Sequence, residues 1–417
     1  MPKEVSYVSR VHFDSSVRLL TFVPVASLSL EAAILSKQRQ RRMQQQHQEH
    51  NHGLDSKQRT TSVVEKVTLP GGKELQWLPV VLTDGAEDGS SIISCAISKD
   101  GSRIATATDN YVVHLWDRFT GQLIAPLEGH QDQVLVVAFA PDGERLISGS
   151  SDFKAIIWNL ANGQPAVTLD HHTGAVWCCT YSPDGETIAT GSFDETVCLW
   201  TTEGQLKHTL ADHDGQITHL TFSSDSKLLA SCAENIAFIW DCETGMRRHR
   251  LERHTAPIWN MSFSHDGRRV VTCGDDMTSR VWSVDTGEEL VTLREHAGSV
   301  WGIGFSANDQ EIASGSYDST IAVCDSFTGE TKFTIRERPA QVNDLAYSKS
   351  GKYFATGDAE NFVKVWDAST GDFVAEFQGH EDNVKTVQWT PDDRALVSCS
   401  ADGTVRVWDF VDLMRML

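Results

Sequence analysis

Short apolar segments separated by tight turns fill the chain from about residue 90 to its end. In one unit, Val134 to Phe139 is an apolar run, and Pro141-Asp142-Gly143 then provides a turn in which proline presets φ and glycine accepts a positive φ. Asn162-Gly163 marks a later turn of the hairpin type. The pattern predicts a four-stranded antiparallel meander, with strands near 134–139, 145–149, 155–158 and 165–169.

The same unit recurs eight times. A pair that begins with tryptophan, or with cysteine in one unit, returns at spacings of 42, 42, 40, 42, 42, 42 and 42 residues. Such a fixed period is the mark of a repeat architecture. The pairs are Trp116-Asp117, Trp158-Asn159, Trp200-Thr201, Trp240-Asp241, Trp282-Ser283, Cys324-Asp325, Trp366-Asp367 and Trp408-Asp409.

A histidine stands 27 or 28 residues before most of these pairs, at His130, His172, His213, His254, His296 and His380. The arrangement resembles the WD40-repeat family, whose units of about 40–45 residues carry a Gly-His near the start and a Trp-Asp near the end. The resemblance covers some four fifths of the chain. It implies an all-β, eight-bladed WD40 β-propeller over residues 71–417, preceded by a largely disordered or partly helical extension at 1–70.

Closure of such a ring needs a strand from outside the last repeat. After Trp408-Asp409 only Phe410 to Leu417 remain, which leaves the eighth meander one strand short. Leu75 to Leu82 is the candidate, because Leu82 matches the apolar residue that precedes the histidine position in other units. We therefore expect a strand near 75–82 to close the last blade.

The family resemblance also implies a hydrogen-bonded tetrad of His, Ser/Thr, Asp and Trp within a unit. A collection of Ser, His and Asp is also found in hydrolases, but burial of each polar group with a partner accounts for it without catalysis. We expect these residues to be structural and no residue to be catalytic. Four complete sets are His130, Ser148, Asp152 and Trp158; His172, Thr190, Asp194 and Trp200; His254, Thr272, Asp276 and Trp282; and His380, Ser398, Asp402 and Trp408.

Four other units depart from this pattern. The first lacks the histidine and has Asn110 at the aspartate position, and the fourth is shortened near Glu234. The sixth has Cys324 in place of tryptophan, and the seventh has Arg338 and Glu360. These blades are expected to be less rigid, or to present irregular edges to partners.

Aromatic residues gather at one position of the repeat. In family terms, the residue after the first apolar position of the first strand lies near the mouth of the central channel, and Trp177, Trp259 and Trp301 occupy it. Phe193 and Tyr317 stand just before turn aspartates. Aromatic anchors ringed by polar loops are typical of protein-binding hot spots. The alternative is that these tryptophans only pack against neighbouring blades.

Charge is divided unevenly along the chain. Residues 1–70 hold 10 Lys/Arg and 6 Asp/Glu, a net of +4, which leaves 26 against 51, a net of −25, for residues 71–417. An acidic body repels phosphate backbones, so direct nucleic-acid binding by the propeller is not expected, and proteins or peptides with basic patches fit better. We expect a monomeric propeller within a complex. No apolar stretch is long enough for a membrane span or has the form of a secretory signal.

Two further features favour a non-catalytic interpretation. Cys178-Cys179 resembles the vicinal cysteines of eight-bladed quinoprotein dehydrogenases, but adjacent strand residues point to opposite faces and cannot form a disulfide. The nine cysteines predict free thiols in a reducing compartment. His47, His50 and His52 lie in a polar tract without a matching ligand set, so neither metal nor cofactor is expected.

The extension contains a Gln/His/Arg-rich part near 37–60, and residues from Leu28 to about Gln48 have good helix formers. The sequence as a whole predicts a protein–protein interaction scaffold or adaptor in the cytoplasm, the nucleus or both. One alternative is a nuclear adaptor associated with chromatin or transcription, which the basic run Lys37 to Arg42 would serve. The other is a quinoprotein-like redox propeller.

Overall fold

The chain divides into two units, Met1–Arg59 and Thr60–Leu417. The computed structural model describes residues 65–77, 79–83, 91–336, 338 and 340–415, all in the second unit. The expected helix near 28–48 and the polar part near 37–60 lie outside the described residues. Within the described part, no helix is long and apolar enough to span a bilayer.

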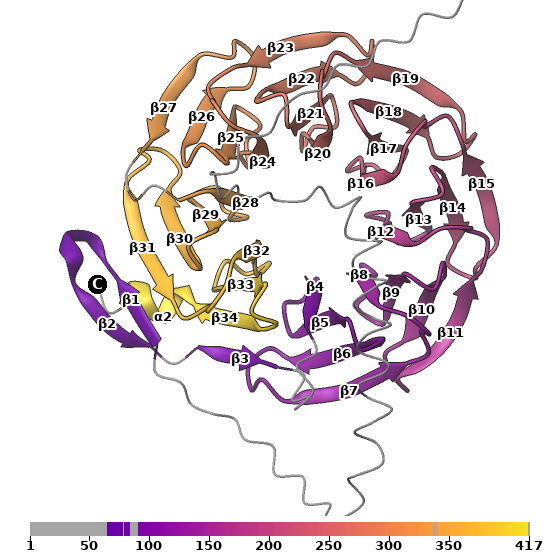
Figure 1. The fold of residues 1–417 in the computed structure, drawn as a ribbon, viewed down its shortest axis with the longest axis horizontal. Helices are drawn as coiled ribbons and strands as arrows, with labels where there is room; N and C mark the ends of the chain where they lie inside the picture. Colours follow the sequence, from indigo (N-terminus) through magenta and orange to yellow (C-terminus); the bar gives the residue numbers. More distant parts are fainter. Residues whose placement is uncertain (1–64, 78, 84–90, 337, 339, 416–417) are drawn as a thin grey trace, which may run out of the picture. The chain divides into compact units, whose positions relative to one another are not determined.

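The second unit is a ring of eight antiparallel sheets (Figure 1). Strands run from the innermost to the outermost in chain order. Blade 1 contains β4 (Ile92–Ile97), β5 (Arg103–Thr108), β6 (Val112–Asp117) and β7 (Leu123–Glu128). Blade 2 contains β8 (Val134–Phe139), β9 (Arg145–Ser150), β10 (Ala155–Asn159) and β11 (Gln164–Leu169). Blade 3 contains β12 (Val176–Tyr181), β13 (Thr187–Ser192), β14 (Val197–Thr201) and β15 (Leu206–Leu210).

Blade 4 contains β16 (Ile217–Phe222), β17 (Leu228–Ala233), β18 (Ile236–Asp241) and β19 (Arg247–Glu252). Blade 5 contains β20 (Ile258–Phe263), β21 (Arg269–Gly274), β22 (Ser279–Ser283) and β23 (Glu289–Leu293). Blade 6 contains β24 (Val300–Phe305), β25 (Glu311–Ser316), β26 (Ile321–Asp325) and β27 (Thr331–Ile335). Blade 7 contains β28 (Val342–Tyr347), β29 (Tyr353–Asp358), β30 (Phe362–Asp367) and β31 (Phe373–Gln378).

The core lies between blades rather than within them. Each cluster of buried apolar side chains spans two consecutive sheets, as when Trp158 of blade 2 packs with Leu115 and Leu127 of blade 1. A meander has two apolar faces, and stacking in a ring buries both of them. Each seam between blades is therefore a layer of the core.

The eighth blade combines both ends of the described chain. Its inner strands are β32 (Val384–Trp389), β33 (Ala395–Ser400) and β34 (Val405–Asp409), and its outer strand is β3 (Val80–Leu82). Leu82 lies opposite Val405, and its buried side chain joins the core between blades 8 and 1. The strand expected over 75–82 is shorter, because residues 74–77 pair elsewhere.

Those residues form a hairpin that has no counterpart in the other repeats. It consists of β1 (Glu65–Thr68), a short 3-10 turn η1 (Pro70–Gly72) and β2 (Glu74–Trp77), and β1 adds to the outer edge of β31 to make a six-stranded sheet. The propeller sheet thus begins before residue 71, where we expected its boundary.

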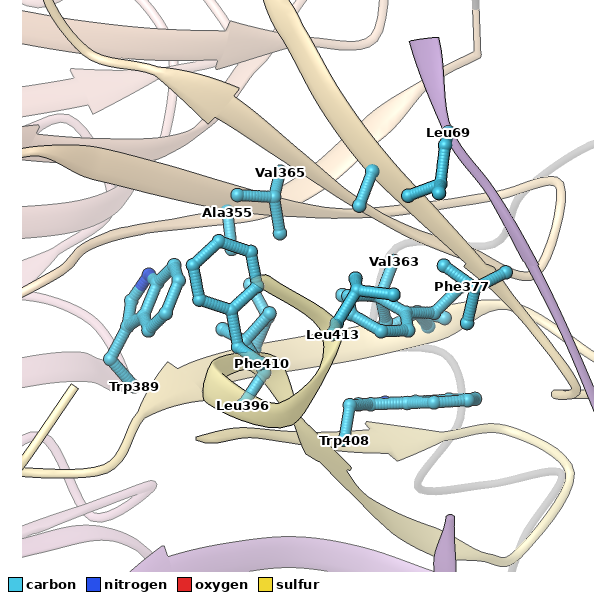
Figure 2. Packing of buried hydrophobic residues seen from close by; sticks show 14 residues of the cluster. Leu69, Ala355, Val363, Val365, Phe377, Trp389, Leu396, Trp408, Phe410 and Leu413 are labelled. Carbon is cyan, nitrogen blue, oxygen red and sulfur yellow. The ribbon is translucent and has the colours of Figure 1, made fainter. Parts of the chain in front are cut away.

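The hairpin and the C-terminal helix α2 (Phe410–Arg415) both cover the seam between blades 7 and 8. Figure 2 shows Phe410 and Leu413 of the helix among Val363, Phe377 and Trp389, with Leu69 of the hairpin nearby. Glu65 forms an ion pair with Arg406 of blade 8, and both side chains are buried. The segment from Glu65 to Leu82 therefore holds the last two blades together.

Candidate interaction surfaces

The four tetrads are continuous hydrogen-bond chains. In blade 2, His130 Nδ1 lies 2.8 Å from the Asp152 carboxylate, and His130 Nε2 lies 2.7 Å from Ser148 Oγ. Trp158 Nε1 donates to the same Ser148 Oγ at 2.8 Å. Because a carboxylate only accepts, Nδ1 carries the proton and the serine hydroxyl donates to Nε2. Each of these side-chain polar groups in the tetrad has a hydrogen-bond partner, which offsets the cost of burying it.

The other three sets repeat this geometry within about 0.2 Å. Burial lowers the pKa of His172 and of His254, which favours the neutral imidazole. Although burial alone would raise the pKa of Asp402, hydrogen bonding and attraction from His380 hold it at about 2. The hydroxyls of Ser148, Thr190, Thr272 and Ser398 are fully buried, so these serines and threonines are not exposed nucleophiles.

Two irregular blades retain part of the network. In blade 4, His213 bonds Ser231, which also accepts from Trp240, but the shortened turn provides no aspartate, and burial lowers the pKa of His213 to about 3. In blade 6, His296 bonds Ser314 and Thr320 although Cys324 replaces the tryptophan.

Blade 7 has a different polar core. Lys364 and Asp358 form a buried ion pair at 2.7 Å, and Lys364 Nζ also donates to the carbonyl of Arg338. The Arg338 side chain turns outward to Glu376 at 3.0 Å and lies over the ring of Phe373. Glu360, at the aspartate position of the repeat, is exposed. An ion pair thus replaces the histidine–aspartate pair of the four regular blades.

The channel-mouth position is a β-bulge in every blade. The inner strand skips one residue in its pairing with the second strand, for example Trp177 between Val176 and Cys178. A bulge leaves its extra residue unpaired and redirects the side chain. The eight bulge residues are Ile93, Leu135, Trp177, Thr218, Trp259, Trp301, Asn343 and Lys385.

The predicted aromatic residues form two clusters on one face of the ring. This top face consists of the loops before the inner strands and the turns between second and third strands. Trp177 stacks on Phe193 with ring centroids 5.2 Å apart in blade 3. In blades 5 and 6, Trp301 lies 6.1 Å from both Trp259 and Tyr317. All five side chains are half-buried. The indole N–H groups of Trp259 and Trp301 have no acceptor among the described atoms.

Three more apolar residues of this face were not foreseen. Tyr111, Phe153 and Met277 occupy the turns between second and third strands with φ of 76°, 72° and 63° and are 39%, 48% and 47% exposed. Blades 6, 7 and 8 have Ser319, Asn361 and Gly403 in the equivalent turns. The sequence could have indicated them, because each follows directly after the turn aspartate of its repeat or, in blade 1, after Asn110.

The vicinal cysteines do not form a disulfide. Cys178 and Cys179 are both free, and burial raises the pKa of each thiol. Among the described residues, no group of His, Cys, Asp and Glu is arranged to hold a metal ion. His47, His50 and His52 lie outside the described residues.

These features define an eight-bladed β-propeller with a buried tetrad in its regular blades. The model of the WD domain, G-beta repeat, matches residues 80–117, 121–159, 163–201, 204–241, 245–283, 287–325, 329–367 and 371–409. The chain therefore belongs to the WD40 family, whose fold commonly serves as a protein-interaction scaffold. Each match begins with the outer strand of one blade and ends in the third strand of the next, which is the offset that closes the ring.

Among solved structures, the computationally designed Ika8 protein is similar to this chain. The two share 29% identity with a TM-score of 0.70, over 79% of this chain and 98% of that one. No curated protein matches the chain.

Proposed function

We propose that the protein is an interaction scaffold that binds partner proteins through the top face of its propeller. The observation that supports this most strongly is the set of apolar tips, Tyr111, Phe153 and Met277, at left-handed backbone positions. A left-handed conformation costs a bulky residue roughly 1–2 kcal/mol, and exposure of its apolar surface adds to that cost. Strain of this kind persists at positions that serve binding.

Two of the apolar tips lie in blades that neighbour or contain the aromatic clusters. Phe153 belongs to blade 2, beside the Trp177 cluster of blade 3, and Met277 belongs to blade 5, which also contains Trp259. Tyr111 belongs to blade 1. Aromatic anchors at the centre of an interface contribute most of its binding energy. A partner that covers the tips would also contact the half-buried tryptophans.

The charge of this face over blades 2 to 4 favours basic partners. Asp132, Glu195, Asp214 and Glu234 are exposed in the loops of these blades, whereas Arg253 and Arg294 are exposed in the loops that lead into blades 5 and 6. Complementary charge speeds association and selects among partners, so proteins or peptides with basic patches are the expected ligands. The proposal assigns no catalytic step to the propeller and requires no cofactor.

Co-purification with matched variants tests the proposal. A Tyr111→Ser/Phe153→Ser/Met277→Ser variant removes the apolar tips of the top face. The control, Met246→Ser/Phe119→Ser/Phe327→Ser, changes three residues of comparable character in the turns between third and fourth strands, which are 70%, 65% and 56% exposed. We expect the top-face variant to lose a defined partner set that the control retains, with both melting as the wild type does. Loss in the control alone, or in neither variant, would exclude the top face.

A further inference from the structure

Turns on the opposite, bottom face of the ring show how neighbouring blades recognise a carboxylate. These turns join the first and second strands of each blade. In blade 6 the fourth residue of this turn is Asp309, whose carboxylate accepts from the backbone N–H groups of His265 and Asp266 in blade 5, at 2.9 and 2.8 Å. Two consecutive amides thus hold both oxygens of one carboxylate, and the His265 ring nitrogen Nδ1 lies 2.8 Å from one of these oxygens.

The same arrangement occurs at the seam between blades 7 and 8. Asp393 accepts from the N–H groups of Lys349 and Ser350, both at 2.7 Å. At the seam between blades 3 and 4, Ser226 accepts from the N–H of Asp184 at 3.0 Å. In these three seams, the even-numbered blade supplies an oxygen to the turn of the blade before it.

The seam between blades 1 and 2 lacks that oxygen. The equivalent residue of blade 2 is Gly143, and nothing lies within 4 Å of the place where its Cβ would stand. The equivalent amides in blade 1 are those of Lys99 and Asp100, and neither has an acceptor within the described part of the chain. An open cavity of about 390 Å³ occupies the place, lined by Lys99, Asp100, Arg103, Pro141, Asp142, Gly143 and Glu144.

The other glycine seams differ from this one. A Cβ on Gly351 would stand 2.9 Å from the Cβ of Ala307, and one on Gly267 would stand 3.7 Å from Ser224 Oγ. Cβ atoms on Gly101 and Gly185 would stand 3.4 and 3.5 Å from Pro391 and Pro141, so at each of these seams the neighbouring turn lies at or within contact distance. Only Gly143, among the turn glycines of this face, looks onto open space.

We propose that this cavity binds a carboxylate group of a partner protein, which takes the place that Asp309 and Asp393 fill in the sibling seams. The ligand's two oxygens accept from the N–H groups of Lys99 and Asp100. An aspartate or glutamate side chain and a peptide C-terminus share this chemistry. The site is on the bottom face and does not depend on the proposed function of the top face.

Nearby charges refine the specificity. Lys99 and Arg103 are cations at the cavity, and Arg103 donates to the carbonyl of Gly143 at 3.5 Å. The Asp100 carboxylate faces its own turn and accepts from Ser98 and Ser102 at 2.6 and 2.7 Å, and Asp142 is paired with Arg145 at 3.0 Å. Glu144 is exposed and repels the ligand. These side-chain charges nearly balance, so the backbone N–H groups of Lys99 and Asp100 determine the specificity. Two donors side by side favour a carboxylate, which has two acceptor oxygens, over an Asn or Gln side chain, which has one.

Backbone-amide NMR on the full chain, labelled with ²H and ¹⁵N, tests the site with three short probes. Ac-Gly-Asp-Gly-NH₂ carries a side-chain carboxylate, Ac-Gly-Asn-Gly-NH₂ is its neutral counterpart, and Ac-Gly-Gly-Gly with a free C-terminus carries the other source. We expect at least one carboxylate probe to give saturable chemical-shift changes of the Lys99 and Asp100 amides. The dissociation constant from these changes should be at least tenfold lower than that of the asparagine probe. The two carboxylate arms distinguish a side chain from a C-terminus.

A Gly143→Asp variant should abolish these shifts and raise the melting temperature, since it supplies the carboxylate in cis as Asp309 does. Gly143→Ala adds a Cβ at the same positive φ but supplies no acceptor, so it should leave the shifts largely in place. Equal binding of the asparagine probe, shifts that survive Gly143→Asp, or no shift of either amide would each overturn the proposal. None of these outcomes bears on top-face binding.

Discussion

Leu82 lies opposite Val405 in the sheet of blade 8, so a strand from near the start of the described chain completes a blade whose other strands come from its end. Figure 1 shows β3, in indigo, beside β34, in yellow, two strands that lie far apart in the sequence. Ring closure therefore depends on pairing between distant segments rather than on any single repeat.

Truncation of the Leu82 side chain in this closing strand should destabilise the whole ring. Leu82 is fully buried, so Leu82→Ala removes core volume at the seam between blades 8 and 1 and should cost about 2–5 kcal/mol of unfolding free energy. The matched control is Leu206→Ala in the outer strand of blade 3, where Leu206 is 41% exposed; it should cost under about 1 kcal/mol. Urea denaturation of both variants measures the difference. Equal effects would show that β3 does not close the ring.

Removal of the central hydroxyl should lower the free energy of unfolding more in a blade with a complete tetrad than in a blade without the histidine. In blade 5, Thr272 Oγ1 bonds both His254 Nε2 and Trp282 Nε1, so Thr272→Val leaves two buried groups without partners and should cost about 2–5 kcal/mol. In blade 7, Thr356 Oγ1 accepts from Trp366 with no histidine present, so Thr356→Val should cost about half as much. Thermal unfolding compares them. A larger loss in blade 7 would contradict the role assigned to the tetrads.

A carboxyl group on the inner strand of blade 7 should make stability depend on pH. Burial raises the pKa of Asp344 to about 6, although its carboxylate accepts from the N–H groups of Val387 and Leu345. The folded pKa exceeds the unfolded value of about 3.9, so the favourable contribution of this group is full below pH 4 and is lost as the pH rises through 6.

Asp344→Asn removes that pH dependence. The free energy of unfolding of the variant, relative to the wild type, should rise by about 1–3 kcal/mol between pH 4 and pH 7.5. Denaturant titrations at the two pH values measure it. A constant difference would show that the Asp344 pKa is not raised in the folded state.

Much of the fold could be predicted because each sequence repeat corresponds to one four-stranded unit of the ring. The spacing of Trp158, Trp200 and their equivalents marks the blades, and turns such as Pro141-Asp142-Gly143 mark the strands. The hairpin of β1 and β2 could not be found in this way, since its two strands have only four residues each and follow no repeat. Of the two, β1 pairs with β31 of blade 7 and β2 pairs with β1. The ion pair of Lys364 and Asp358 was also missed, because the acidic residue stands two positions before the one that the repeat uses.

Site prediction reached the aromatic residues but not the backbone that presents them. The tryptophan positions follow from the repeat, whereas the positive φ of Phe153 and Met277 depends on turn geometry that side-chain type does not reveal. The cavity beside Gly143 was equally hidden, because glycine is ordinary in such turns and only its neighbours in space distinguish it.

Hydrogen–deuterium exchange on the complex with a co-purified partner shows which face of the propeller the partner covers. We expect slower exchange in the top-face turns that contain Tyr111, Phe153 and Met277, with the bottom-face turns near Phe119 and Phe327 unchanged. Protection confined to the bottom face or to the outer strands would contradict the claim that the top face is the binding surface.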